Sequence, residues 1–173
     1  ERDFWIIKLD ENGSKIWDRT LGGNNLDQFK NILEVADDNY IVGGGSYSSI
    51  SGIKTEISRG QSDYWLIKLN TLGEIEWDKT IGGDGIDGIN SFTLNNNSLM
   101  ICGTSYSNIS GEKNENSRGA TDYWIVKLQP ESLSTSNSNL FNLQIYPNPT
   151  TQTIYIDFDK PFLAIKTKIF NTI

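Results

Sequence analysis

Apolar residues in this chain come in short runs that are rich in β-branched and aromatic side chains. Gly, Asn and Asp residues separate the runs, and no stretch keeps an apolar period of 3.6 residues over three helical turns. Runs of this kind, bounded by turn residues, are typical of β-strands. The pattern predicts strands near residues 4–9, 15–21, 29–36, 39–47, 64–69, 75–81, 89–94, 98–106 and 123–128.

Two of these segments repeat almost residue for residue. The sequence Asp-Phe-Trp-Ile-Ile-Lys-Leu at residues 3–9 returns in closely similar form at residues 63–69 and 122–128, with spacings of 60 and then 59 residues. The sequence Trp-Asp-Arg-Thr-Leu-Gly-Gly at residues 17–23 returns in similar form at residues 77–83. Four strands in about 60 residues are the pattern of one β-propeller blade. An all-β fold built from four-stranded antiparallel blades is therefore expected.

The repeat resembles the blade repeat of secreted bacterial β-propellers, which are related in architecture to kelch-like arrays. The resemblance rests on Asp-[Phe/Tyr]-Trp, Trp-Asp-[Lys/Arg]-Thr and a closing Gly-x-Ser-Tyr-Ser. Its units are residues 3–62, 63–121 and the partial unit 122–128, so blade repeats are expected over residues 1–128. The resemblance implies a fold but no activity, because propellers carry unrelated functions on one scaffold.

The order of the strands predicts how they divide into blades. If one blade takes the strands near residues 29, 39, 64 and 75, then residues 1–23 supply the last two strands of a preceding blade. Residues 89–128 then supply the first three strands of a following blade that lacks its fourth. Propellers use roughly four to eight blades, so further blades are expected upstream in the complete gene product.

The composition changes after residue 128. All four prolines lie beyond it, while all 16 glycines and all five tryptophans lie before it. Residues 129–139 have the Ser- and Asn-rich composition of a linker. Residues 140–173 contain Tyr146-Pro147-Asn148-Pro149, followed by alternating patterns that predict strands near residues 153–158 and 165–170.

This tail resembles part of the C-terminal sorting domain of the type IX secretion pathway of Bacteroidetes, in which a Tyr-Pro-Asn-Pro motif opens a small Ig-like β-sandwich. The resemblance implies that the outer-membrane translocon is a partner. It also implies that the protein is secreted or held at the outer-membrane surface. The family domain continues through further strands after the part that residues 140–173 resemble.

Composition excludes several classes of function. The chain holds no histidine, so it has no imidazole base and no histidine zinc ligand. Its single cysteine, Cys102, aligns with Gly43 and is expected to be a small buried residue. The net charge of −7 argues against nucleic acid as a partner. No apolar run approaches the roughly 20 residues of a membrane-spanning helix.

Tryptophan recurs at two repeat positions, residues 5, 65 and 124 and residues 17 and 77. Packing between blades is the expected role, and stacking on a sugar is the alternative. Asp3, Asp63 and Asp122 begin the same repeated strand. They are expected to cap a turn or to pair with an arginine, with calcium binding as the alternative.

Candidate binding residues lie in the long connections 48–62 and 107–121, which share Ile-Ser-Gly, a lysine and Ser-Arg-Gly. Long ordered loops on β scaffolds are where binding usually resides. The alternative is that these loops cover the sheet edge and that the arginines neutralise carboxylates. The candidates are Lys54, Arg59, Lys113 and Arg118.

Asp84 and Asp87 follow a Gly-Gly pair and are the candidate ligands of a metal, with calcium as the metal considered. The simpler interpretation is that the Gly-Gly pairs are bends at strand ends. No residue pair stands out as catalytic.

The leading functional hypothesis is a non-enzymatic binding or adhesion module that recognises a glycan or a surface protein. One alternative is a propeller enzyme that acts on polysaccharide through carboxylates and calcium. Another is a cargo protein whose main partner is the secretion translocon.

Overall fold

The computed structural model describes residues 2–96, 98–129, 143–146 and 155–158. Its strands are all paired antiparallel, and the one helical element described is the short 3₁₀ turn η1 (Ala36–Asp38). The all-β antiparallel fold predicted from the sequence is confirmed.

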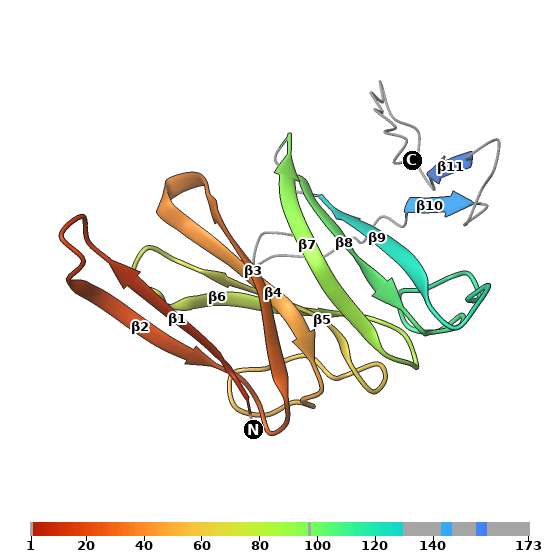
Figure 1. Ribbon diagram of the computed structural model, residues 1–173, viewed down its shortest axis with the longest axis horizontal. Helices are drawn as coiled ribbons and strands as arrows, with labels where there is room; N and C mark the ends of the chain where they lie inside the picture. The colour runs from red at the N-terminus through yellow and green to blue at the C-terminus, as the bar shows by residue number, and fades with distance from the viewer. Residues whose placement is uncertain (1, 97, 130–142, 147–154, 159–173) are drawn as a thin grey trace.

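Three sheets stand side by side in chain order (Figure 1). The first sheet consists of β1 (Phe4–Leu9) and β2 (Lys15–Leu21). The central sheet has the order β3 (Asp27–Val35), β4 (Asn39–Ser46), β5 (Asp63–Leu69), β6 (Ile75–Ile81). The third sheet has the order β7 (Asp87–Asn95), β8 (Ser98–Ser105), β9 (Asp122–Leu128).

This division into two, four and three strands matches the grouping expected from the repeat. The described residues form an open stack of sheets, so closure into a propeller ring stays a prediction. Strands β3 and β7 begin two residues earlier than expected, because Asp27 pairs with Ser46 and Asp87 pairs with Ser105 across the sheet.

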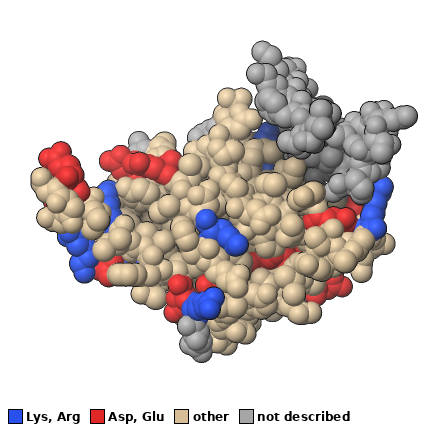
Figure 2. All heavy atoms as spheres, viewed as in Figure 1, with Lys and Arg blue, Asp and Glu red and all other residues tan. Residues whose placement is uncertain are grey.

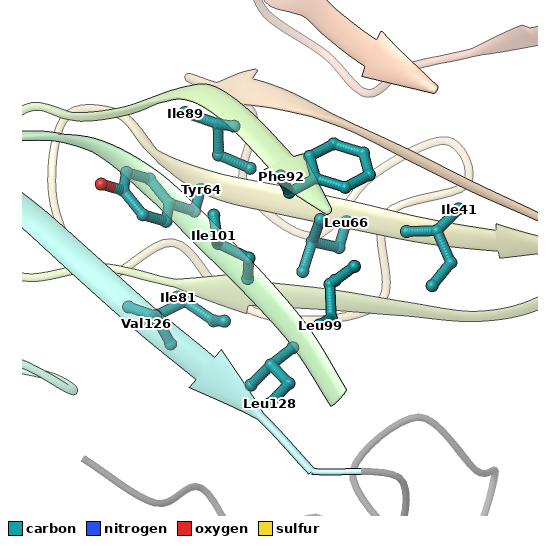
Figure 3. Packing of buried hydrophobic residues seen from close by; sticks show 10 residues of the cluster. All are labelled: Ile41, Tyr64, Leu66, Ile81, Ile89, Phe92, Leu99, Ile101, Val126 and Leu128. Carbon is teal, nitrogen blue, oxygen red and sulfur yellow. The ribbon is translucent and has the colours of Figure 1, made fainter. Parts of the chain in front are cut away.

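Two apolar layers hold the stack together, one on each side of the central sheet. Successive residues of a strand point to opposite faces, so Trp65 and Ile67 of β5 face the first sheet while Tyr64 and Leu66 face the third. Both faces of β5 are buried, which is why its sequence is an almost continuous apolar run. Figure 3 shows the layer between the central and third sheets, formed by Ile41, Tyr64, Leu66, Ile81, Ile89, Phe92, Leu99, Ile101, Val126 and Leu128.

Two expectations of burial are wrong, and both concern residues at the ends of the stack. Trp5 is 68% exposed although Trp65, at the same repeat position, is fully buried. Cys102 is exposed on the third sheet, whereas its counterpart Gly43 lies under the ring of Phe92. Among the described residues no further sheet covers either outer face, so repeat positions that are buried in the centre are open at the ends.

In the tail, β10 (Leu143–Tyr146) pairs with β11 (Tyr155–Phe158) in an antiparallel hairpin. Strand β11 falls within the expected strand 153–158. Pro147, Asn148 and Pro149, the expected strand 165–170 and nearly all of the expected linker 129–139 lie outside the described residues. No helix in the described part of the chain is long and apolar enough to span a membrane.

Candidate functional site

The two long connections lie at the same end of the sheets, here called the loop end (Figure 1). It comprises residues 47–62 between β4 and β5, residues 106–121 between β8 and β9, and the Gly-Gly corners at 22–23 and 82–83 that follow β2 and β6. The tight hairpin turns lie at the opposite end of the sheets. Figure 2 shows one face of the molecule, on which charged side chains are scattered rather than gathered in a single patch.

Each long loop is anchored on the corner of the preceding sheet by a glycine. Gly52 has a φ of +55° and Gly111 a φ of +54°, a region that favours glycine. A Cβ on Gly52 would lie 2.4 Å from the carbonyl oxygen of Gly22, and one on Gly111 would lie 2.1 Å from that of Gly82. The repeated Ser-Gly therefore permits a close approach that joins neighbouring sheets.

Asp27 and Asp87 are buried aspartates that fix the Gly-Gly corners. Oδ2 of Asp87 accepts hydrogen bonds from the backbone N–H of Gly83 at 2.7 Å and from the hydroxyl of Ser107 at 2.8 Å. Asp27 makes the same two contacts with Gly23 and Ser48. Because Oδ2 of Asp87 accepts hydrogen bonds from both the corner and the long loop, the role that the structure shows for this oxygen is structural.

Asp63 and Asp122 hold the other end of each loop. Oδ2 of Asp63 accepts from the hydroxyl of Ser58 at 2.6 Å and from the backbone N–H of Arg59 at 2.8 Å, and Asp122 makes the equivalent contacts. Burial raises the pKa of Asp63, while these two hydrogen bonds act in the opposite direction. Of the roles expected for Asp63 and Asp122, the structure shows the capping of a turn.

The two candidate calcium ligands, Asp84 and Asp87, differ in exposure and in hydrogen bonding. Asp84 is exposed, and its Oδ1 accepts from the hydroxyl of Ser110 at 3.0 Å and the backbone N–H of Asn108 at 3.2 Å. Oδ1 of Asp87 is buried and has no hydrogen-bond partner among the described residues. Within the described ranges no group of three or more acidic or cysteine side chains lies close enough to hold a metal ion. Calcium binding stays a prediction.

The two candidate lysines are buried beneath the loops. The Nζ of Lys54 donates to the hydroxyl of Thr80 and lies 5.6 Å from the ring centre of Trp65. Burial lowers the pKa of Lys54, and the nearby carboxylates of Asp78 and Asp63 act against that shift. The Nζ of Lys113 donates to the hydroxyl of Ser105 at 3.1 Å and to the carbonyl oxygen of Ser107 at 2.7 Å. Both lysines bind the protein's own residues.

The two candidate arginines differ in their surroundings. Nη2 of Arg59 lies 2.9 Å from Oε1 of Glu112, so Arg59 links the first long loop to the second. Arg118 is the more exposed arginine and lies 3.7 Å from Glu115 of its own loop. Of the four predicted binding residues, Arg118 presents the most accessible charge. Ligand binding by the four residues stays a prediction.

Exposed apolar side chains at the loop end were missed by the sequence interpretation. Ile50 and Ile109 are each 60% exposed at equivalent repeat positions, and Ile57 and Tyr106 are also exposed. Their loops are fixed by the aspartate and glycine contacts described above, so these side chains stand on a rigid scaffold. The available signal was the isoleucine of the repeated Ile-Ser-Gly, an apolar residue in an otherwise polar loop.

A scan against models of protein families finds no match to this chain. A search of curated proteins likewise finds no related protein.

Proposed function

We propose that the three stacked sheets are part of a secreted or cell-surface β-propeller that serves as a binding or adhesion module. The observation that carries the proposal is the set of exposed apolar residues at the loop end: Ile50, Ile57, Tyr106 and Ile109. When a partner covers apolar side chains that are exposed to water on fixed loops, the free energy of the complex is lowered. The half-exposed Arg118 adds a charge to the same end of the sheets. A glycan or a surface protein is the class of partner that this surface fits.

A test of this surface begins with arrays of purified polysaccharides and with immobilised collagen and fibronectin as probes. The double variant Ile50→Ser, Ile109→Ser is expected to weaken binding to each positive probe by about tenfold or more, since two apolar contacts are lost. Surface plasmon resonance gives the affinities. The matched control is Leu72→Ser, because Leu72 is equally exposed but lies in the β5–β6 turn at the other end of the sheets. The proposal fails if no probe binds or if the double variant binds as tightly as the control.

We further propose that the tail directs export by type IX secretion to the outer-membrane surface. The supporting observation is the antiparallel pairing of β10 with β11, in which Tyr146, the first residue of the Tyr146-Pro147-Asn148-Pro149 motif, is the last residue of β10. In a Bacteroidetes host with this pathway, replacing the four motif residues by alanine is expected to abolish appearance of the chain in the medium and on the cell surface. Immunoblots of cell fractions measure this, and unchanged export would contradict the proposal.

A further inference from the structure

Two buried carboxylates, those of Asp63 and Asp87, flank the Gly82–Gly83 corner that connects β6 to β7. Oδ1 of Asp63 lies against Gly82, where an added Cβ would overlap it. Oδ2 of Asp87 accepts from the backbone N–H of Gly83, the next residue, at 2.7 Å. The backbone N–H of Asp87 also donates to the carbonyl oxygen of Ser62 at 2.7 Å. The two aspartates therefore hold successive residues of one corner, at the junction of the central and third sheets.

Each of these two carboxylates has one oxygen with partners and one without. In both side chains Oδ2 accepts from a backbone N–H and from a serine hydroxyl. Oδ1 of Asp63 and Oδ1 of Asp87 are buried and have no hydrogen-bond partner among the described residues. Buried polar atoms are nearly always hydrogen-bonded, and an acceptor without a donor destabilises the fold. An unpartnered oxygen on each of two buried carboxylates at one corner points to a bound group.

The charges around the corner favour a cation as that group. The lysines of the two long loops donate to hydroxyl and carbonyl oxygens, and Arg59 pairs with Glu112. The charge of Asp63 acts on Lys54 over a longer range. Burial raises the pKa of Asp63, and the like charge of Asp87 adds to that rise. A cation that both carboxylates coordinate would offset their burial and their mutual repulsion.

The repeat supplies an internal comparison at the Gly22–Gly23 corner. Asp3 lies against Gly22, and Asp27 accepts from the backbone N–H of Gly23, as their counterparts do at the other corner. Oδ1 of Asp27 is also buried and without a hydrogen-bond partner among the described residues. Asp3, however, is exposed, so water reaches its carboxylate. Of these two corners, the one at Gly82–Gly83 has both carboxylates buried.

We infer that Asp63 and Asp87 bind one calcium ion at the Gly82–Gly83 corner, each through its Oδ1 atom. Calcium prefers oxygen ligands, and its two positive charges balance the two carboxylates. It accepts about six to eight oxygens in a flexible geometry, so backbone carbonyl oxygens and water complete the set. Asp63, rather than the exposed Asp84, is then the partner of Asp87. Since Asp63 begins β5 and Asp87 begins β7, the ion links the central sheet to the third.

The test follows thermal unfolding of the full chain by circular dichroism, after treatment with EDTA and dialysis, with calcium chloride as the titrant. The unfolding midpoint is expected to rise by about 5 °C or more when free calcium exceeds its Kd about 100-fold. Isothermal titration calorimetry is expected to show one calcium ion per chain. Magnesium chloride is expected to give a smaller shift, because magnesium demands octahedral geometry and gives up its water reluctantly.

Variants of the protein locate the site. Asp63→Asn and Asp87→Asn each keep the shape of the side chain and remove one of the two charges. Without calcium, each variant is expected to be at least as stable as the wild type, because the repulsion between like charges is gone. With calcium, the rise in the midpoint is expected to be lost, which a purely structural role would not produce. The matched control is Asp3→Asn, which changes the same repeat position where it is exposed and is expected to keep the full rise.

Three outcomes would overturn the inference. The first is a midpoint that calcium leaves unchanged, together with no heat of binding. The second is a full rise that persists in either Asp63→Asn or Asp87→Asn, which would place the calcium elsewhere on this acidic chain. The third is an equal loss of the rise in the control Asp3→Asn.

Discussion

Replacing Trp65 by alanine is expected to lower the free energy of unfolding by about 4 kcal/mol. Trp65 is fully buried between the first and central sheets, with its ring centre 5.4 Å from that of Phe4. Its indole N–H also donates to the buried carboxylate of Asp78. Truncation would leave both a cavity between the sheets and a carboxylate with one donor fewer. Chemical denaturation followed by circular dichroism measures the change.

Trp5→Ala is the matched control for that measurement. It removes the same side chain from the same repeat position, but Trp5 is 68% exposed. Its indole N–H donates to Asp18 at 3.3 Å near the surface, so a change within about 0.5 kcal/mol is expected. Equal losses for the two variants would contradict the described burial and would mean that the outer face of the first sheet is covered in solution.

Strand positions could be predicted from the sequence because each strand carries its own local signal. The period of the repeat also predicted the grouping into two, four and three strands. Once the strand near residue 29 is taken as the first of a four-stranded sheet, the repeat determines which sheet each other strand belongs to. Side-chain environment could not be predicted in the same way. Trp5 and Trp65 lie in closely similar sequence contexts, yet their burial differs because it depends on whether another sheet is stacked on that face.

The loop residues show a second limit of sequence reasoning. A lysine in a polar loop, such as Lys54 or Lys113, has the local pattern of a solvated cation. Both are buried because the loop folds back over the sheet, which is a tertiary contact without a local signature. The repeat did hold part of the answer, since Asp27 and Ser48 recur as Asp87 and Ser107. In each copy the serine hydroxyl donates a hydrogen bond to the aspartate.

The two arginines of the repeat divide between the two roles expected for the long loops, ligand binding and cover of the sheet edge. Arg59 neutralises Glu112 and joins neighbouring loops, as the sheet-covering alternative supposes. Arg118 occupies the position equivalent to Arg59 in the second long loop, after which no further long loop is described. Its side chain is half-exposed. A single sequence motif can therefore stabilise the stack at one position and be available to a partner at another.

Gly44→Ala in β4 is expected to lower the free energy of unfolding by about 3 kcal/mol, because the added methyl group meets backbone rather than a movable side chain. A Cβ on Gly44 would lie 1.9 Å from the carbonyl oxygen of Gln28 in the paired strand β3. It would also lie 3.0 Å from the ring of Phe4 in the first sheet. No rotamer change relieves the first contact, so β3 and β4 must separate locally. Chemical denaturation measures the loss.

Gly88→Ala supplies the control in the third sheet. Gly88 in β7 stands at the repeat position of Gln28 in β3, the residue whose carbonyl oxygen approaches Gly44. A Cβ on Gly88 would meet nothing within 4 Å. Alanine also restricts the unfolded chain, so this variant is expected to be neutral or more stable by about 0.5 kcal/mol. If Gly44→Ala proves as well tolerated as Gly88→Ala, the close contact between β3 and β4 does not exist in solution. A loss confined to Gly44→Ala instead identifies Gly44 as a packing requirement of the central sheet, set by Gln28 in the paired strand and by Phe4 in the first sheet.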